Sequence, residues 1–340
     1  MTKRSSSITI RDVAREAGVS VATVSRYLNQ NAPVSEKLAD RIQRVMDELD
    51  YIPQETARHL ALRRKNAIGL LLTNMHNDFF GPLLAGIETI VRSEGYNLLV
   101  ATCRPELQTD SYLPLGGHNT DGLLVFANSL GDEQIAQLSE RGFPLVLIHK
   151  TPAEGTSVPF VTVENKAATR KLVDHLITAH GRRRILLMRG PEQQEDSYWR
   201  EVGYRAALAD HGIAFDEALT LRGSFEREVA YAALKTFLAD AQHPLFDAVF
   251  AGDDDAAVGV YEALKEAGLR IPEDVSVVGF DDSRMSPFLM PPLTTVRAPT
   301  EAVGSSAARQ LFCLLEGETP ELETLHPTDI VLRRSCGCAT

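Results

Sequence analysis

The amino-acid sequence predicts an α/β protein in which a small helical head precedes a two-lobed body of doubly wound parallel sheets. Three observations lead to this class. Residues 9–50 carry apolar side chains at helical spacing and no strand pattern. From Ala67 onward, short apolar strand runs alternate with amphipathic helices, which is typical of a parallel sheet. Two such series follow one another, which predicts two similar subdomains within the 340 residues.

The head begins with residues 9–29, TIRDVAREAGVSVATVSRYLN, which read as two short helices and a tight turn. Thr9 can cap the first helix with Asp12 at capping-box distance, Gly18 ends it, and Ser20 caps the second helix. The inward face of the second helix is formed by Val24, Tyr27 and Leu28, and the outward face by Val21, Ala22, Ser25 and Arg26. This pattern predicts a helix-turn-helix whose second helix enters a DNA major groove, although an ordinary helical hairpin is the alternative.

A third helix is expected from Ser35 to Asp50, closing a small three-helix core. Its apolar stripe comprises Leu38, Ile42, Val45, Met46 and Leu49. Arg41 and Arg44 lie off that stripe, where a phosphate contact and a solvated surface charge both remain open.

The body is predicted element by element from apolar runs and helical spacing. The expected strands are 68–73, 96–101, 122–126, 145–148, 184–188, 219–221, 248–250, 275–280 and 330–333. The expected helices are 81–94, 133–141, 166–179, 199–211, 227–239, 256–267 and 300–315. The stretch between Cys103 and Asp121 contains Leu113-Pro114-Leu115-Gly116-Gly117, which should shorten or break a helix there.

Charge is divided unevenly along the chain. Residues 1–66 carry 12 Lys/Arg against 8 Asp/Glu, a charge of +4, and the remainder carries 23 against 38, a charge of −15, which gives the total of −11. A basic head on an acidic body concentrates phosphate attraction at the head.

Several classes of protein are disfavoured. No apolar run is long enough for a membrane helix, and the N-terminus lacks the apolar core of a signal peptide, so we expect a cytoplasmic protein. No glycine-rich phosphate fingerprint follows a strand and no nucleophile elbow is present, so we expect neither a cofactor nor an enzyme. The alternative to a DNA-binding protein is a sugar-binding or enzymatic α/β protein with an incidental helical head.

Cysteine usage predicts neither a disulfide framework nor a metal site. The four cysteines are Cys103, Cys313, Cys336 and Cys338. We interpret Cys336-Gly337-Cys338 as an incidental pair rather than a zinc site, because no His or Cys partner stands at ligand spacing in the sequence. The run 253–255, all aspartate, is excluded as a metal site on the same ground.

Three polar residues stand directly after predicted strands: His149, Asp253 and Asp281. Ligands of open α/β sheets bind beyond the carboxyl ends of the strands, so these side chains are candidates for ligand binding.

Several segments together resemble the LacI/GalR family of bacterial transcriptional repressors over nearly the whole chain. They are residues 9–29, Thr120-Asp121-Gly122, Gly203-Tyr204, 272–282 (PEDVSVVGFDD) and 291–296 (PPLTTV). The resemblance implies a DNA-binding domain at 1–51, a hinge helix at 52–66, and an effector-binding and dimerisation domain at 67–340. The last resembles periplasmic sugar-binding proteins, with lobe 1 at about 67–164 and 293–324 and lobe 2 at about 165–292 and 325–340.

For DNA, the resemblance implies contacts from Thr9, Ser20, Val21, Ala22, Thr23, Ser25, Arg26, Asn29, Arg58 and Leu60. Val21 and Ala22 would meet thymine methyls and Arg26 a guanine. Thr23, Ser25 and Asn29 would position the backbone on phosphate or cap locally. In the hinge, Leu60 would act as a minor-groove wedge; a plain linker is the alternative.

For the effector, the resemblance implies hydrogen bonds from Arg200, Asp253 and Asp281 and packing from Phe79, Phe80 and Phe225. A plain core position is the alternative for Phe79 or Phe80. His149 stands where the family often has aspartate, and Asp253 where it often has asparagine. Asp254 and Asp282 are expected to be helix caps or lobe contacts rather than ligand groups. The implied function is a cytoplasmic, homodimeric repressor of a palindromic operator, with no membrane partner, controlled by a small ligand that is a sugar or sugar derivative.

Overall fold

A computed structural model describes residues 8–29, 34–49, 51, 65–76, 78–103 and 113–339. The chain separates into two compact units, residues 1–65 and 66–340, which we call the head and the body. The expected hinge helix falls on residues 52–66, most of which lie outside the described residues, as do Arg58 and Leu60.

The head contains three helices in its described part: α1 (Ile10–Glu16), α2 (Val21–Asn29) and α3 (Glu36–Glu48). They enclose a small core in which Val13, Val24 and Ile42 are fully buried. The predicted inward residues Tyr27, Leu28, Leu38 and Leu49 pack against it. The predicted fold of the head is therefore confirmed, with α1 and α3 slightly shorter than expected.

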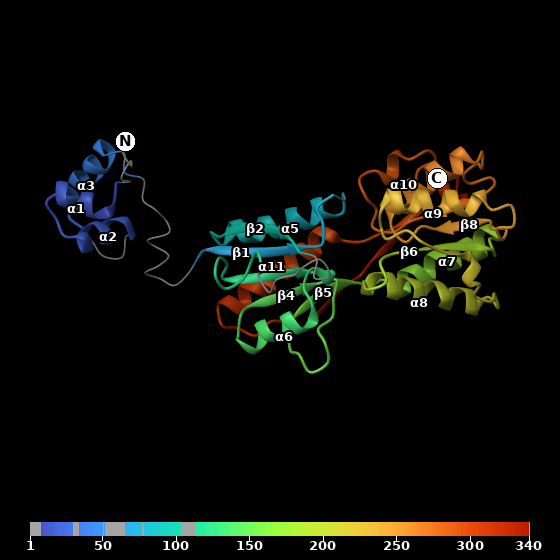
Figure 1. The fold of residues 1–340 in the computed structure, drawn as a ribbon, viewed down its shortest axis with the longest axis horizontal. Helices are drawn as coiled ribbons and strands as arrows, with labels where there is room; N and C mark the ends of the chain where they lie inside the picture. Colours follow the sequence, from blue (N-terminus) through green and yellow to red (C-terminus); the bar gives the residue numbers. More distant parts are fainter. Residues whose placement is uncertain are drawn as a thin grey trace, which may run out of the picture. The chain divides into compact units, whose positions relative to one another are not determined.

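Lobe 1 of the body is built on a six-stranded parallel sheet in the order β11-β5-β4-β3-β1-β2 (Figure 1). Its strands are β1 (Ala67–Leu72), β2 (Asn97–Thr102), β3 (Gly122–Phe126), β4 (Leu145–Ile148), β5 (Phe160–Val163) and β11 (Glu323–His326). Helices α5 (Phe80–Ser93) and α11 (Thr300–Leu315) cover one face, and α6 (Asp132–Glu140) covers the other. Strand alternation decides the faces: Leu70 and Leu72 point to the α5/α11 side, and Leu71 to the α6 side.

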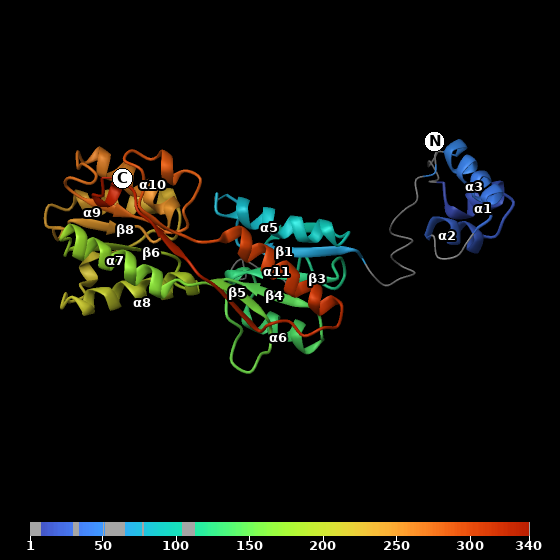
Figure 2. The same ribbon diagram turned by 180° about the vertical axis from the view of Figure 1, so that it is seen from behind.

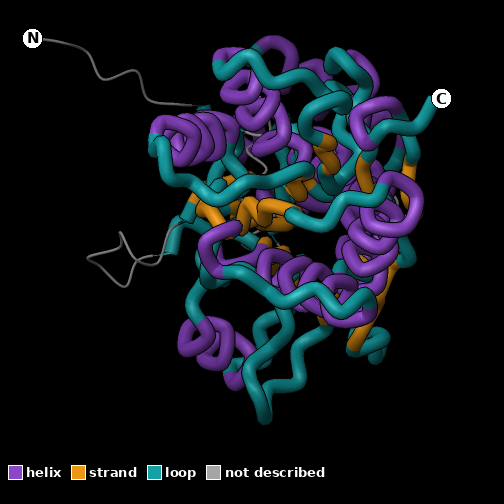
Figure 3. Tube along the Cα trace, turned by 90° about the vertical axis from the view of Figure 1, so that its right-hand side faces the viewer, coloured by secondary structure: helices purple, strands orange, loops and turns teal. Residues whose placement is uncertain are grey.

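Lobe 2 repeats the arrangement around a four-stranded parallel sheet in the order β7-β6-β8-β9. Its strands are β6 (Ile185–Arg189), β7 (Thr220–Arg222), β8 (Ala248–Phe250) and β9 (Ser276–Val278). Helices α7 (Lys166–His180) and α8 (Glu195–Asp210) cover one face, and α9 (Arg227–Ala239) and α10 (Asp254–Glu266) cover the other (Figure 2). Each sheet thus has helices on both faces, which confirms the predicted doubly wound class. Figure 3 shows the strands of the body lying among its helices.

The chain passes between the lobes at three places: residues 164–165, 298–299 and 327–328. Near the second and third crossings, β10 (Thr295–Arg297) and β12 (Asp329–Val331) pair as an antiparallel ribbon. Lobe 2 therefore extends past residue 293 through β10, because Thr294 bridges to Val278. Lobe 1 extends past residue 324, because His326 pairs with Val163.

Other expectations about the body were wrong in detail. The sequence pattern missed β5, β10 and β11, and it began α8 at Trp199 instead of Glu195. The final strand was expected at 330–333 and lies at Asp329–Val331. Short 3-10 turns occur at Ala127–Ser129, Glu217–Leu219, Ser286–Phe288 and Arg334–Cys336. Described residues 113–121 contain no helix, in line with the proline and paired glycines there. Among the described residues, no helix has the length and apolar character needed to cross a membrane.

Candidate ligand cleft and DNA-binding surface

The helix-turn-helix of the head is fixed by local hydrogen bonds at its two caps. The Asp12 carboxylate accepts from the backbone N–H of Thr9 at 3.0 Å and from its hydroxyl at 2.7 Å, and these bonds lower the pKa of Asp12. The Ser20 hydroxyl accepts from the backbone N–H of Thr23 at 3.1 Å, so Ser20 is the N-cap of α2. Between them Gly18 takes the left-handed conformation, with φ of +62°.

The outward face of α2 is accessible as the sequence predicts. Val21 is 41% exposed, Ala22 and Arg26 are exposed, and Ser25 is half-buried. The hydroxyl of Thr23 lies 2.8 Å from that of Ser20, so it takes part in the cap. The side chain of Asn29 lies outside the described residues. On α3, Arg41 and Arg44 are also exposed. The head therefore presents a short helix whose apolar and basic side chains point away from its core.

The body contains a cavity of about 910 Å³ between its two lobes. Lobe 1 contributes an aromatic wall, in which Phe79, Phe80 and Phe126 contact one another with ring centroids 5.2 to 5.7 Å apart. Lobe 2 contributes Arg200, Phe225 and Asp253, and Asp281 follows β9. Six of the seven predicted ligand residues line this cavity, namely Phe79, Phe80, Arg200, Phe225, Asp253 and Asp281.

His149, the seventh predicted residue, does not line the cavity. It is 3% exposed and lies behind the aromatic wall, with its ring centroid 5.7 Å from that of Phe79 and 5.6 Å from that of Phe126. Its Nδ1 is 3.0 Å from Oδ2 of Asp196, on α8 of the opposite lobe. His149 therefore joins the two lobes instead of facing the cavity.

Arg200 is held on every side by lobe 2 and its loops. Its Nε donates to Asn165 Oδ1 at 2.9 Å, one terminal nitrogen donates to the carbonyl of Gly252 at 2.8 Å, and the other to Asp281 at 3.3 Å. Its guanidinium also lies 3.7 Å from the ring centroid of Phe280. Because all three nitrogens have protein partners, the guanidinium is fixed in one orientation.

The carboxyl groups of the cavity have displaced pKa values. Burial raises the pKa of Asp281 to about 7 against the opposing effect of Arg200. Burial and the neighbouring charge of Asp281 raise the pKa of Asp253 well above its ordinary value. Burial acts to raise the pKa of Asp196, but His149, Arg200 and the side-chain amide of Asn165 together outweigh it, so this pKa is lowered. Near neutral pH the cavity therefore offers protonated as well as ionised carboxyl groups.

Asp254 and Asp282 have protein partners, as expected, but the cap of the neighbouring helix α10 is Asp253 and not Asp254. Asp253 is the N-cap of α10, accepting from the N–H of Ala256 at 2.8 Å. Asp254, expected to be a cap or lobe contact, instead accepts from the N–H of Ser283 at 2.7 Å and from the hydroxyl of Thr295 at 2.6 Å. Asp282 binds two arginines of the ribbon region, Arg297 at 2.7 Å and Arg333 at 2.6 Å.

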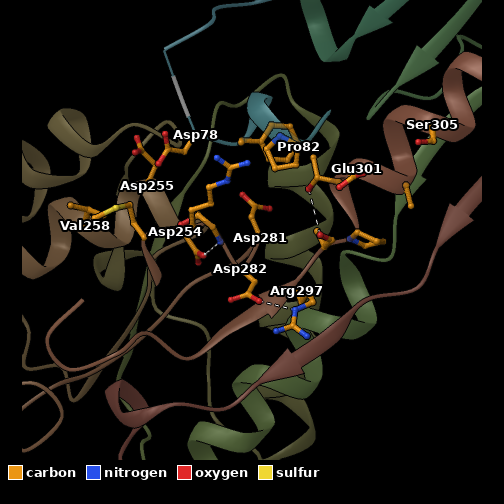
Figure 4. A pocket seen from close by; sticks show the side chains of 18 of the residues that line it. Asp78, Pro82, Asp254, Asp255, Val258, Asp281, Asp282, Arg297, Glu301 and Ser305 are labelled. Carbon is orange, nitrogen blue, oxygen red and sulfur yellow. Dashed lines mark hydrogen bonds and ion pairs between the residues drawn. The ribbon is translucent and has the colours of Figure 1, made fainter. Parts of the chain in front are cut away.

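A second pocket of about 620 Å³ lies on the other side of Asp281, between α5, α10 and the start of α11 (Figure 4). Asp78 and Asp255 lie side by side at its rim, and the Asp282–Arg297 ion pair borders it. Burial and the charge of Asp78 are among the causes that raise the pKa of Asp255. Three arginines, Arg284, Arg297 and Arg309, also line this pocket, and Asp255 lines both pockets.

Sequence reasoning missed several residues of the cavity. Phe126 is the last residue of β3 and Asn128 follows it, and Thr73 and Asn74 follow β1, so the strand-end rule would have found them. Asn165 and Asp196 could not be found in this way, because both belong to helix starts that the fold brings beneath Arg200. Three residues of the cavity lining, Ser224, Phe225 and Asp281, have positive φ without being glycine.

Two family descriptions match the chain. Residues 9–54 match "Bacterial regulatory proteins, lacI family", and residues 173–336 match "Periplasmic binding protein-like domain". The probable HTH-type transcriptional repressor ExuR of Bacillus subtilis is 31% identical over 334 residues, which cover 96% of this chain and 98% of that protein. The ribose operon repressor of Escherichia coli is 31% identical over 330 residues, with 96% and 98% covered.

Solved structures show the same architecture. A complex of the transcriptional regulator CelR with cellobiose has a TM-score of 0.71 and 31% identity, covering 96% of this chain and 99% of its own. The lac repressor dimer bound to operator and the anti-inducer ONPF has a TM-score of 0.79 and 25% identity, covering 97% and 99%. The chain belongs to the LacI family of bacterial transcriptional regulators, with a helix-turn-helix DNA-binding head and a periplasmic-binding-protein-like body.

Proposed function

We propose that this protein is a homodimeric repressor whose affinity for a palindromic operator is controlled by a neutral sugar or sugar derivative bound between the lobes. The outward residues Val21, Ala22 and Arg26 of α2 supply the base contacts. Two heads read the two half-sites, as in the operator-bound dimer of the lac repressor. We propose a cytoplasmic location, because a regulator of this kind must reach the chromosome.

The donors and acceptors that line the cavity are the main support for a neutral sugar as the ligand. The pKa of Asp281 is raised to about 7, so its carboxyl group can donate or accept a hydrogen bond near neutral pH, and burial and the charge of Asp281 also raise the pKa of Asp253. Three of the five N–H groups of Arg200 donate to Asn165, Gly252 and Asp281, so its positive charge is shared with a neighbouring carboxylate. Adjacent hydroxyls of a neutral polyol can donate to and accept from this lining, whereas a carboxylate or phosphate would place another negative charge beside Asp196, Asp253 and Asp281.

The aromatic wall completes the match. Phe79, Phe80 and Phe126 from lobe 1 face the polar groups of lobe 2 across the cavity. A sugar has this same division, because its C–H faces are apolar while its hydroxyls lie around the ring edge. Two of the relatives support this ligand class: one is a ribose operon repressor, and CelR was solved in complex with cellobiose.

Contacts between the lobes supply the means of control. The His149–Asp196 pair, the 2.9 Å bond from the N–H of Thr151 to Glu195, and the bond from Asn128 to the carbonyl of Gln193 all join lobe 1 to the start of α8. A ligand that prefers one degree of lobe closure shifts the equilibrium between states with and without these contacts. The acids of the cavity act in recognition, and no chemical step is assigned to them.

Isothermal calorimetry tests this proposal with four ligand classes: neutral mono- and disaccharides, sugar acids, sugar phosphates and nucleosides. We expect one neutral sugar to bind with one site per chain and to be recovered unchanged, as checked by mass spectrometry. Binding only by an acid or phosphate would overturn the proposed ligand class. Conversion of a bound sugar into a product would overturn the purely regulatory role.

A further inference from the structure

The C-terminal tail of the body brings two cysteines to two histidines. His175 and His180 stand in the last turns of α7, and Cys336 and Cys338 follow β12 at the end of the chain. One nitrogen from each histidine and one sulfur from each cysteine all lie within 4.8 Å of one another. The sequence spacing excluded a zinc site around the cysteines, but the fold supplies partners from about 160 positions earlier in the chain.

The separations of these atoms match a tetrahedral metal centre. The two Nε2 atoms are 3.2 Å apart, Cys338 Sγ is 3.5 Å from each of them, and Cys336 Sγ is 3.8 Å from that of His175. Zinc bound at about 2.3 Å from sulfur and about 2.0 Å from nitrogen places its tetrahedral ligand atoms roughly 3.3 to 3.8 Å apart. Four of the six separations between ligand atoms therefore match a zinc centre, and the other two lie within 4.8 Å.

Both halves of the cluster are held by the body itself. On the helix side, Leu172, Val173 and Leu176 of α7 are fully buried in the core. On the tail side, the Ser335 hydroxyl donates to the carbonyl of Val277 at 2.6 Å, and the Ser276 hydroxyl donates to the carbonyl of Cys336 at 2.8 Å. The ligand atoms are therefore preorganised by secondary structure and by the edge of the lobe 2 sheet.

Two further features suit a thiolate centre. Gly337 has φ of +112°, and a Cβ built there would lie 2.9 Å from Nδ1 of His180, so glycine lets the tail turn closely around that ring. The Thr294 hydroxyl lies 3.1 Å from Cys336 Sγ and can donate to it. A hydroxyl that donates to a ligating sulfur orients it and stabilises its negative charge.

We propose that the body binds one Zn²⁺ through Nε2 of His175 and His180 and Sγ of Cys336 and Cys338. Two thiolates and two imidazoles in a tetrahedral arrangement select zinc over Mg²⁺ or Ca²⁺, which require oxygen ligands. Binding releases the two thiol protons to solvent. All four positions are taken by protein atoms, so the centre is structural: it ties the C-terminal tail to the end of α7.

The test uses the full-length protein, freed of any histidine tag, stripped of metal and kept reduced. Titration with Zn²⁺ against a chromophoric chelator should show one equivalent bound per chain. Co²⁺ in its place should give the visible absorption of tetrahedral cobalt together with a thiolate-to-cobalt charge-transfer band. Cys338→Ser and His180→Gln should each lower zinc affinity at least ~100-fold. Cys313→Ser is the matched control, because Cys313 lies on α11 outside the cluster, and it should bind like the parent.

Thermal unfolding and circular dichroism keep the result interpretable. One equivalent of Zn²⁺ should raise the melting temperature of the parent and of Cys313→Ser, but not that of Cys338→Ser, while all three retain the same fold without metal. Absence of stoichiometric binding to the folded, reduced parent would overturn the proposal. Equal zinc affinity in Cys338→Ser would also overturn it, as would a Cys336–Cys338 disulfide that forms in place of metal binding, seen as a mass two hydrogens lower.

Discussion

The head and the body place their functional side chains in opposite ways. In the head, Val21 is 41% exposed and Arg26 is exposed, so the residues of the reading face contribute little to the core. In the body, Arg200 is 4% exposed, and its guanidinium joins Asn165, Gly252 and Asp281. A change on α2 should therefore alter DNA binding alone, whereas a change in the cavity should alter ligand binding and stability together.

Removing residues 1–65 gives the largest expected effect. Sequence-specific DNA binding should disappear, because all described helices of the head are lost, while ligand affinity of the body should be unchanged. Fluorescence anisotropy with operator DNA and calorimetry with the ligand measure the two properties separately. Survival of operator binding in the truncated chain would contradict the division between head and body.

Arg200→Ala should be the most damaging single change in the body. We expect ligand affinity to fall by about 2 kcal/mol, or ~30-fold, because a charged hydrogen-bonding group is removed beside buried acids. Operator affinity in the absence of ligand should stay the same, as measured by anisotropy. Arg205→Ala is the control, since Arg205 lies on the same helix but is half-exposed and paired with Glu201. Equal ligand affinities in the two variants would refute the cavity assignment.

Asp281 of the body and Asp12 of the head should respond to pH with opposite signs. The pKa of Asp281 is raised to about 7, so protonation of this side chain stabilises the folded protein. This contribution to the free energy of unfolding is lost as the pH rises from about 4 to about 7. Asp12 has a lowered pKa, so its contribution is present above the ordinary value and is lost as pH falls.

Asp281→Asn should accordingly stabilise the body at pH 8 by about 1 to 2 kcal/mol and flatten its stability between pH 5 and pH 8. Urea unfolding followed by tryptophan fluorescence across this range measures the effect. Asp274→Asn is a control of opposite sign, because the ion pair with Arg270 lowers the pKa of Asp274. An unaltered pH profile in Asp281→Asn would show that this carboxyl group is not the source of the dependence.

Leu60→Ala tests the segment between the two units. If Leu60 is a minor-groove wedge, its truncation should weaken operator binding by at least about 1 kcal/mol, since a wedge supports the unstacking of a base step. Ligand affinity should not change. Anisotropy on the operator at fixed salt gives the measurement, and a loss of less than a few tenths of a kcal/mol would favour a plain linker.

Ser20→Ala gives the smallest predicted effect and is confined to the head. Loss of the Ser20 cap should destabilise α2 by about 1 kcal/mol, seen as faster hydrogen exchange of its amides. Ser35→Ala offers a matched control, because Ser35 occupies the N-cap position of α3 without a side-chain cap bond. Equal exchange in the two variants would rule out the capping role of Ser20.

Sequence patterns predicted those parts of the fold that follow from continuous burial or clear capping. All six residues of β1 are buried, and its apolar run was recognised. By contrast, β11 has the polar sequence ETLH at a sheet edge, where pairing with β5 decides its conformation. The first turn of α8 begins with Glu195 and Asp196, which gave no apolar signal. Short polar elements fixed by tertiary contacts therefore escaped prediction.

The site shows the same limit. The strand-end rule located Asp253 and Asp281, because their position depends only on sheet topology. It also selected His149, yet the partner that removes His149 from the cavity, Asp196, belongs to the other lobe. The Cys336–Cys338 pair could not be linked to His175 and His180 from spacing, since only packing of the tail on lobe 2 joins them.

Linkage between the two units is tested most directly by titrating an operator complex with the ligand. The full-length protein would be bound to a labelled palindromic operator at low salt, where phosphate contacts are strongest, and neutral sugars would be added in turn. We predict tight binding that one neutral sugar releases in the parent and in Arg205→Ala, but not in Arg200→Ala. Operator binding that no ligand changes, or release that persists in Arg200→Ala, would contradict control of the head by the cavity of the body.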